Sequence, residues 1–118
     1  MKQLTAAQKA KIAYEAMDNK KAEDIRIISL TGISTLADYF LIASGNNVPH
    51  VQALVDEVED KLGRAGYDAR VEGYQNAGWI LMDFGDVVVH VFSKDDRLFY
   101  DLERIWRDGK SISPEELE

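Results

Sequence analysis

The fold is decided by residues 79–92, which read Trp79-Ile80-Leu81-Met82-Asp83-Phe84-Gly85-Asp86-Val87-Val88-Val89-His90-Val91-Phe92. Two apolar runs, 79–84 and 87–92, flank Gly85-Asp86, a pair typical of a tight hairpin. Successive side chains of a strand point to opposite faces, so Trp79, Leu81 and Asp83 share one face and Ile80, Met82 and Phe84 the other. Both faces are largely apolar. Either the strand is central in its sheet, or part of one face awaits a partner.

Trp79 is the residue of this hairpin best suited to anchor a partner, because tryptophan is enriched at binding hot spots. A tryptophan buried in the core is the alternative interpretation. Arg97 and Tyr100 are expected on the exposed side of a following helix, near the hairpin. For these two residues the alternative is an ordinary solvated helix face.

The rest of the chain extends the hairpin into a layered domain. Helices are predicted for residues 5–18, for a segment that begins near Pro49 and stops at Gly66, and after Ser93; further strands are predicted at residues 25–30, 39–43 and 68–72. This order predicts the α/β (α+β) class, with a mixed β-sheet of about five strands flanked by helices. The helix that follows Pro49 either crosses over between neighbouring strands or links strands that are not neighbours.

Apolar spacing and capping residues support the helices. An i, i+3, i+4, i+7, i+11 stripe is typical of an amphipathic helix, and here it is formed by Val51, Leu54, Val55, Val58 and Leu62. Thr5 and Ser93 can cap the first and last helices, and Leu98, Leu102, Ile105 and Trp106 form a core stripe in the last one. Residues 1–108 are therefore expected to form a single domain, and residues 109–118 a polar, frayed tail.

Composition narrows the function classes. The chain has 118 residues, 46% of them hydrophobic and 30% charged, which fits one ordinary globular domain. It has no cysteine, which excludes disulfides and thiolate metal sites. No segment approaches the roughly 18 continuous apolar residues of a membrane span, and residues 1–4 lack the features of a signal peptide. The cytoplasm is the expected compartment.

The charge is negative and unevenly distributed. The net charge is −7; residues 1–66 hold nine acids and eight bases, whereas residues 67–118 hold twelve acids and six bases. Nucleic-acid binders usually present a clustered basic face, and this chain has none, so little direct nucleic-acid binding is expected. An acidic half suggests a basic protein partner, although solubility alone would also explain it.

The histidines make a metal site an unfavourable interpretation. His50 and His90 are the only two, and they lie forty residues apart without cysteine partners. The position of His90 in an apolar strand predicts a half-buried side chain that makes one hydrogen bond. His50 is expected in the first turn of a helix, facing solvent.

One turn suggests an enzyme. Ser44-Gly45 follows an apolar strand and precedes a helix, an arrangement that can bring backbone amides to a phosphate and that begins nucleotidyltransferase active sites. Those enzymes also need carboxylates on an adjacent strand to hold two metal ions. The next acids, Asp56, Glu57, Glu59 and Asp60, fall on the polar face of the following helix. A glycine turn that closes a strand is the simpler interpretation, and a divergent nucleotidyltransferase is the alternative.

Five segments together resemble the bacterial ribosomal silencing factor family, which is related to the plant protein Iojap. They are residues 21–25 (KAEDI), 37–46 (ADYFLIASGN), 71–73 (VEG), 78–92 (GWILMDFGDVVVHVF) and 97–106 (RLFYDLERIW). The resemblance covers roughly residues 5–107 and implies a nucleotidyltransferase-like fold without the catalytic carboxylates. It implies neither an enzymatic activity nor a cofactor.

The resemblance also implies a partner. Members of the family bind the large ribosomal subunit through its fourteenth ribosomal protein, at the interface between the subunits. Bound there, they sterically block joining of the small subunit and lower translation when nutrients are scarce. A role in large-subunit assembly and a homodimeric free form are further implications.

Carried over by position, the partner-binding surface of the family implicates the strand with Trp79 and Asp83. Neighbourhood adds Ile80, Met82, Arg97 and Tyr100 to the expected contact residues.

Overall fold

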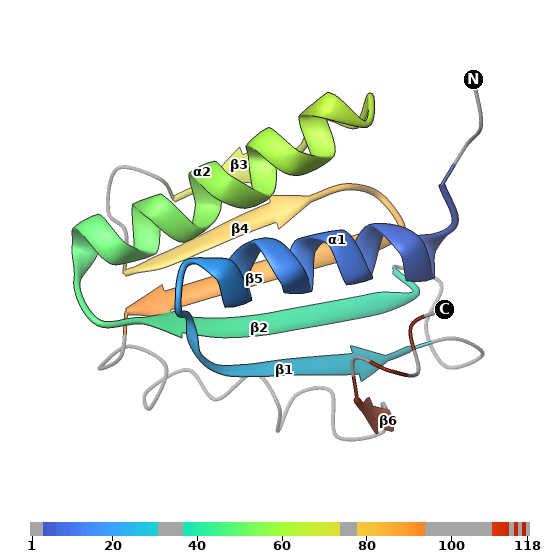
Figure 1. Cartoon of the computed structure of the whole chain (residues 1–118), viewed down its shortest axis with the longest axis horizontal. Helices are drawn as coiled ribbons and strands as arrows, with labels where there is room; N and C mark the ends of the chain where they lie inside the picture. Colours follow the sequence, from blue (N-terminus) through green and yellow to red (C-terminus); the bar gives the residue numbers. More distant parts are fainter. Residues whose placement is uncertain are drawn as a thin grey trace.

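A six-stranded mixed sheet with two helices on one face forms the body of the computed structural model, which describes residues 4–30, 37–73, 78–93, 110–113, 115 and 117 (Figure 1). Along the chain the elements are α1 (Ala6–Asn19), β1 (Glu23–Ser29), β2 (Tyr39–Gly45), α2 (Val48–Arg64), β3 (Arg70–Glu72), β4 (Trp79–Asp83), β5 (Val87–Ser93) and β6 (Lys110–Ile112). The strand order across the sheet is β3-β4-β5-β2-β1-β6. The predicted mixed sheet with flanking helices is confirmed, with one strand more than expected.

The connections settle the alternative left open for α2. This helix leaves the central strand β2 and leads to β3 at the far edge of the sheet, so it links strands that are not neighbours. The chain then returns through β4 and β5 as an antiparallel meander, and β5 pairs in parallel with β2. The predicted hairpin is present, with Asp83 opposite Val88 and Trp79 opposite Phe92.

Local sequence signals explain both helices. Thr5 caps α1 through a reciprocal capping box with Gln8. Asn47 caps α2, Pro49 lies in the first turn, and Gly66 takes a positive φ of 95° just beyond the helix end. All five residues of the predicted α2 stripe have no exposed surface.

Apolar side chains form two clusters, one on each face of the sheet. The larger cluster joins both helices to side chains such as Leu41, Ile80 and Val89. The smaller cluster lies on the opposite face and contains Phe40, Phe92 and other residues of β1, β2 and β5. Alternation along each strand separates the two clusters, as the strand period of two requires.

The tip of the β4–β5 hairpin is fixed from two sides. Lys9 is only 8% exposed, and its ammonium lies 3.0 Å from an Asp86 carboxylate oxygen and so links α1 to the turn. The Asp86 carbonyl accepts hydrogen bonds from the amides of Asp38 and Tyr39. Asp86 therefore does more than form the turn, which was its simplest sequence interpretation.

The prediction of a frayed tail from residue 109 onward is wrong for the described part of that segment. Lys110–Ile112 pairs antiparallel with β1, and Leu117 has no exposed surface within the larger core cluster. The pKa of Tyr14 on α1 is raised by burial and by the charges of Asp18 and Glu115, which places Glu115 near this helix. Backbone pairing and one buried leucine thus hold the segment to the domain.

The helix expected after Ser93 falls outside the described residues. Within the part of the chain that the structure describes, no helix is long and apolar enough to span a membrane.

Candidate partner-binding face

The sheet face that points away from α1 and α2 carries the residues singled out by the sequence. We call the part of it formed by β4 and β5 the Trp79 face; it consists of Trp79, Leu81, Asp83, Val88, His90 and Phe92. Burial differs within this face: Phe92 is 1% exposed and His90 3%, whereas Val88 and all three β4 residues are partly exposed. The β4 side of the face is therefore accessible, and Trp79 is neither fully exposed nor part of a closed core.

Ile80 and Met82 do not lie on this face. Both side chains point toward the helices and have no exposed surface. As the chain is folded here, neither can touch a partner, so their expected place among the contact residues is corrected. The cause is the strand period, because residues next to Trp79 in sequence point away from it in space.

Trp79 is held by two aromatic residues of β5. Its indole Nε1–H donates a hydrogen bond to His90 Nδ1 at 3.1 Å. Its ring stacks on Phe92, with the centroids 5.4 Å apart and the planes inclined by 20°. His90 reaches the indole because it pairs with Leu81, one diagonal step from Trp79 in the ladder. The exposed tryptophan surface is thus presented in a defined orientation.

His90 is a neutral imidazole in an apolar setting. Since Nδ1 accepts the hydrogen bond from the indole N–H, the proton of the neutral ring is on Nε2, which is buried and has no hydrogen-bond partner among the described residues. Burial lowers the pKa of His90 to about 4, because the charged imidazolium would lose its solvation. The prediction of one hydrogen bond is confirmed, but the ring is fully rather than half buried.

Asp83 lies at the end of β4 with its carboxylate beside the hairpin turn. One of its oxygens accepts a hydrogen bond from the Gly85 amide at 2.8 Å. A carboxylate has about four acceptor positions, so this bond leaves capacity for further donors. The partial exposure of Asp83 makes that capacity available at the surface.

A shallow pocket of about 180 Å³ lies beside Trp79 and is lined by Glu72, Gly73, Trp79 and Leu81. Glu72 pairs with Leu81 across the β3–β4 ladder, which places an exposed carboxylate at this end of the face. Gly73 has a φ of 85°, and a Cβ there would collide with the Trp79 carbonyl oxygen. Only glycine fits this approach of the two chain segments.

Sequence reasoning missed His90, Glu72 and Gly73 as parts of the site. The hairpin register fixed by Gly85-Asp86 could have placed His90 diagonal to Trp79. The predicted contact residues Arg97 and Tyr100 lie outside the described residues.

The Ser44-Gly45 turn is explained by packing. A Cβ on Gly45 would lie 2.8 Å from Val51 Cγ2 and 2.9 Å from the Val51 nitrogen, so glycine allows β2 to end against α2. Amides near the helix start are used internally: Asn46 donates to His50 Nδ1, His50 to Asn47 Oδ1, and Val51 to the Asn47 carbonyl. These donors are not free to cradle a phosphate.

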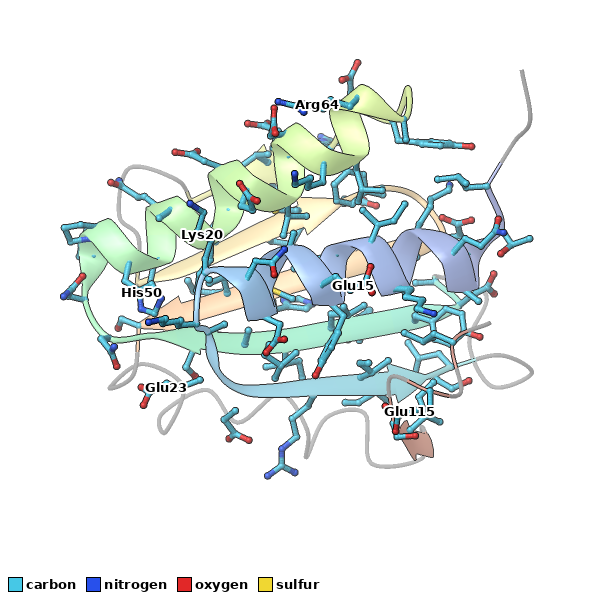
Figure 2. The ribbon with its side chains drawn as sticks, viewed as in Figure 1. Glu15, Lys20, Glu23, His50, Arg64 and Glu115 are labelled. Carbon is cyan, nitrogen blue, oxygen red and sulfur yellow. The ribbon has the colours of Figure 1, made fainter. Side chains whose placement is uncertain are left out.

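His50 also joins the two helices. Its Nε2 lies 2.8 Å from the Lys20 carbonyl oxygen, where α1 ends (Figure 2). The ring is partly buried by these contacts, rather than simply facing solvent. Over the described ranges, no group of three or more histidine, aspartate or glutamate side chains could hold a metal ion.

Comparison with known proteins follows the same segments. A family model described as "Ribosomal silencing factor during starvation" matches residues 3–118. The chain belongs to this family. A ribosomal silencing factor of Bacillus subtilis is 50% identical over 100 residues, which are 84% of this chain and 85% of that protein.

Two further comparisons give a solved structure and a eukaryotic protein that are similar to this chain. A crystal structure of a Chromobacterium violaceum protein matches with a TM-score of 0.85 and 34% identity, over 93% of this chain and 92% of that one. A mouse protein named mitochondrial assembly of ribosomal large subunit protein 1 is 30% identical over 91 residues. That match covers 74% of this chain and 40% of the mouse protein. The family resemblance read from the sequence is confirmed.

Proposed function

We propose that the chain represses translation by binding the large ribosomal subunit and blocking its joining to the small subunit. The observation that carries the proposal is membership of the silencing factor family over residues 3–118. The proposed point of attachment is the fourteenth protein of the large subunit, at the interface between the subunits. A small domain at that position creates a steric clash that opposes the incoming subunit.

The Trp79 face is the surface that we propose for this contact. Trp79 offers a fixed apolar anchor and Asp83 offers acceptor positions for arginine or backbone donors. Ribosomal proteins are usually basic, so a chain with a net charge of −7 would be steered toward one. Arg97 and Tyr100 remain proposed contacts on the strength of the family resemblance.

The proposed function needs binding and no catalysis. The internal use of the amides after Gly45 supports this, because a nucleotidyltransferase would need that turn for phosphate. We place the activity in the cytoplasm, the compartment of bacterial ribosomes, because the similar silencing factor of Bacillus subtilis is bacterial.

Sucrose-gradient sedimentation tests the proposal. Purified large subunits would be mixed with the chain, with and without small subunits. We expect co-sedimentation with large subunits and a smaller peak of joined ribosomes. Absence of binding at micromolar concentration in moderate salt would refute the proposal, and a melting shift with nucleotide and Mg²⁺ would revive the enzyme interpretation.

Variants of the Trp79 face localise the contact. Trp79→Ala should weaken binding by about 2 kcal/mol or more, as truncation of a hot-spot residue does. Asp83→Arg should also weaken binding, whereas Glu59→Arg is its matched control: it changes the charge equally, on an exposed position of α2. Equal binding by the Asp83 and Glu59 variants would show that the contact lies elsewhere.

A role in large-subunit assembly is the second candidate, favoured by the name of the mouse relative. It predicts that depletion of the chain leads to accumulation of precursor particles. Unchanged precursors after depletion would remove this candidate, and co-sedimentation without an effect on subunit joining would favour it.

We further propose that the free chain forms a homodimer through the Trp79 face. Such a dimer would compete with the ribosome, because both would use the same surface. Sedimentation velocity over a range of concentrations tests this, and a self-association unchanged by Trp79→Ala would contradict it.

A further inference from the structure

His90 is a buried polar residue for which the proposed function has no use so far. It is 3% exposed, so it cannot meet a partner itself. Among the described residues, its one hydrogen bond is with Trp79, and its other ring nitrogen has no partner. A buried unsatisfied N–H is unfavourable, and an apolar residue of the same shape would avoid it. Histidine at this position is therefore less favourable for folding than an apolar residue of the same shape would be. What histidine provides and an apolar residue cannot is the hydrogen bond to Trp79.

That hydrogen bond limits what Trp79 can do. Indole has a single donor and no acceptor, and the donor is taken by His90 Nδ1. Phe92 stacks on the same ring and restricts its tilt. Trp79 therefore presents a fixed apolar surface without a free donor. A partner group that meets it would be an alkyl chain, a ring or a cation, rather than an acceptor that seeks an N–H.

We propose that His90 is a positioning residue for partner binding, which acts by holding the Trp79 indole in the orientation that the partner contacts. This proposal rests on the proposed function, since it assumes that the Trp79 face binds the large subunit. Its physical basis is pre-organisation: a ring already fixed in the free chain loses less conformational freedom on binding. The lowered pKa of His90, caused by burial, supports it, because the imidazole stays a neutral acceptor across the physiological range.

Other charged groups around His90 do not alter this acceptor role. Its ladder neighbours are Leu81 on β4 and Ile42 on β2, both apolar, and the Phe40 ring lies 4.8 Å from it, centroid to centroid. Within the described residues, the charged groups on this side of the sheet nearest along the ladder are Asp83, Glu72 and Arg26. Asp83 lies two residues beyond Leu81, Glu72 lies opposite Leu81, and Arg26 on β1 lies opposite Ile42.

A double-mutant cycle tests the proposal. His90→Phe keeps the ring shape and removes the acceptor, and Trp79→Phe removes the donor. We expect His90→Phe to weaken binding to large subunits by about five- to tenfold, the effect of one ordering hydrogen bond. In the Trp79→Phe background the same change should have no further effect, because there is no N–H left to hold.

Three further measurements separate positioning from a general loss of structure. Ile42→Val, a packing change beside His90, should leave affinity unchanged. The Trp79 indole N–H resonance, assigned with Trp79→Phe, should shift in His90→Phe toward the position of a water-exposed indole. His90→Asn, whose Oδ1 can replace Nδ1 as acceptor, should recover part of the affinity; it also keeps the proposal testable if the Phe variant does not fold.

The outcomes are distinct. If the wild-type chain binds and Trp79→Ala does not, but His90→Phe binds like the wild type, the positioning role is refuted and the proposed function stands. An additive effect of His90→Phe in both backgrounds would also refute it. If the wild-type chain does not bind large subunits, the proposed function fails and the positioning role with it.

Discussion

Burial of a neutral His90 predicts that the chain loses stability in mild acid. The folded state holds the pKa of His90 at about 4, against an ordinary value of 6.5 in the unfolded chain. Between these values the unfolded chain binds a proton that the folded chain does not, so acidification favours unfolding. The stabilisation is complete above pH 6.5 and is lost as the pH falls toward 4. From pH 7.5 to pH 5, protonation of His90 in the unfolded chain should lower the free energy of unfolding by about 2 kcal/mol.

Urea unfolding of the wild type and of His90→Phe at pH 7.5 and pH 5 measures this difference. At pH 7.5 the two should differ by about 1 kcal/mol or less, because the variant loses one hydrogen bond but also an unsatisfied buried N–H. Between pH 7.5 and pH 5, the free energy of unfolding should fall by about 2 kcal/mol more in the wild type than in the variant. Carboxylates titrate in both proteins and cancel in the comparison. Equal losses in the two proteins would refute the reasoning.

Three substitutions test other parts of the fold by urea unfolding. Gly73→Ala should destabilise more than Gly85→Ala: both residues have positive φ, which costs a side chain about 1–2 kcal/mol, but only at Gly73 does the new Cβ also strike the Trp79 carbonyl. Equal losses of stability in the two variants would mean that a Cβ at Gly73 meets no obstacle. Lys21→Gly should stabilise the fold by about 0.5–1 kcal/mol, because Lys21 follows the C-cap of α1 with a φ of 62°. A loss of stability would mean that the lysine side chain is needed. Leu117→Ala should lower the free energy of unfolding by about 2–3 kcal/mol, because Leu117 is buried. An unchanged urea midpoint would mean that the tail is frayed, as the sequence predicts.

Periodic signals in the sequence predicted the elements that depend on local patterns. The α2 stripe, from Val51 to Leu62, is buried along its whole length, and the hairpin turns at Gly85-Asp86 as expected. In both cases the residues of the sequence pattern are the residues that form the buried stripe or the turn. Helix and strand periods follow from backbone geometry and do not require knowledge of distant segments.

The last strand could not be predicted in this way. Lys110–Ile112 is short, lies in a polar segment, and owes its existence to β1, more than eighty residues earlier in the chain. Leu117 likewise looks like an isolated apolar residue in an acidic tail until the larger core cluster is assembled around it. Tertiary pairing of this kind overrides a weak local pattern.

In the candidate site, too, local patterns were predictive. Alternation correctly placed Trp79 and Asp83 on one face and Ile80 and Met82 on the other. Adding the second pair to the contact residues by neighbourhood ignored that alternation, and their burial shows the consequence. Proximity along a strand is therefore a poor guide to a shared surface, whereas a spacing of two and the register of the partner strand are good ones.

The hairpin register also explains how a small face can be rigid without being closed. Ile80 and Met82 fix β4 to the helix side of the sheet, and the Lys9–Asp86 ion pair ties the hairpin tip to α1. On the other side Trp79 remains partly exposed, but its ring is stacked and its N–H is bonded. Because these restraints already exist in the free chain, a partner would meet an ordered tryptophan and the ordering cost of association would be small. His90 and Phe92, which restrain the Trp79 ring, should then affect partner binding although both are buried.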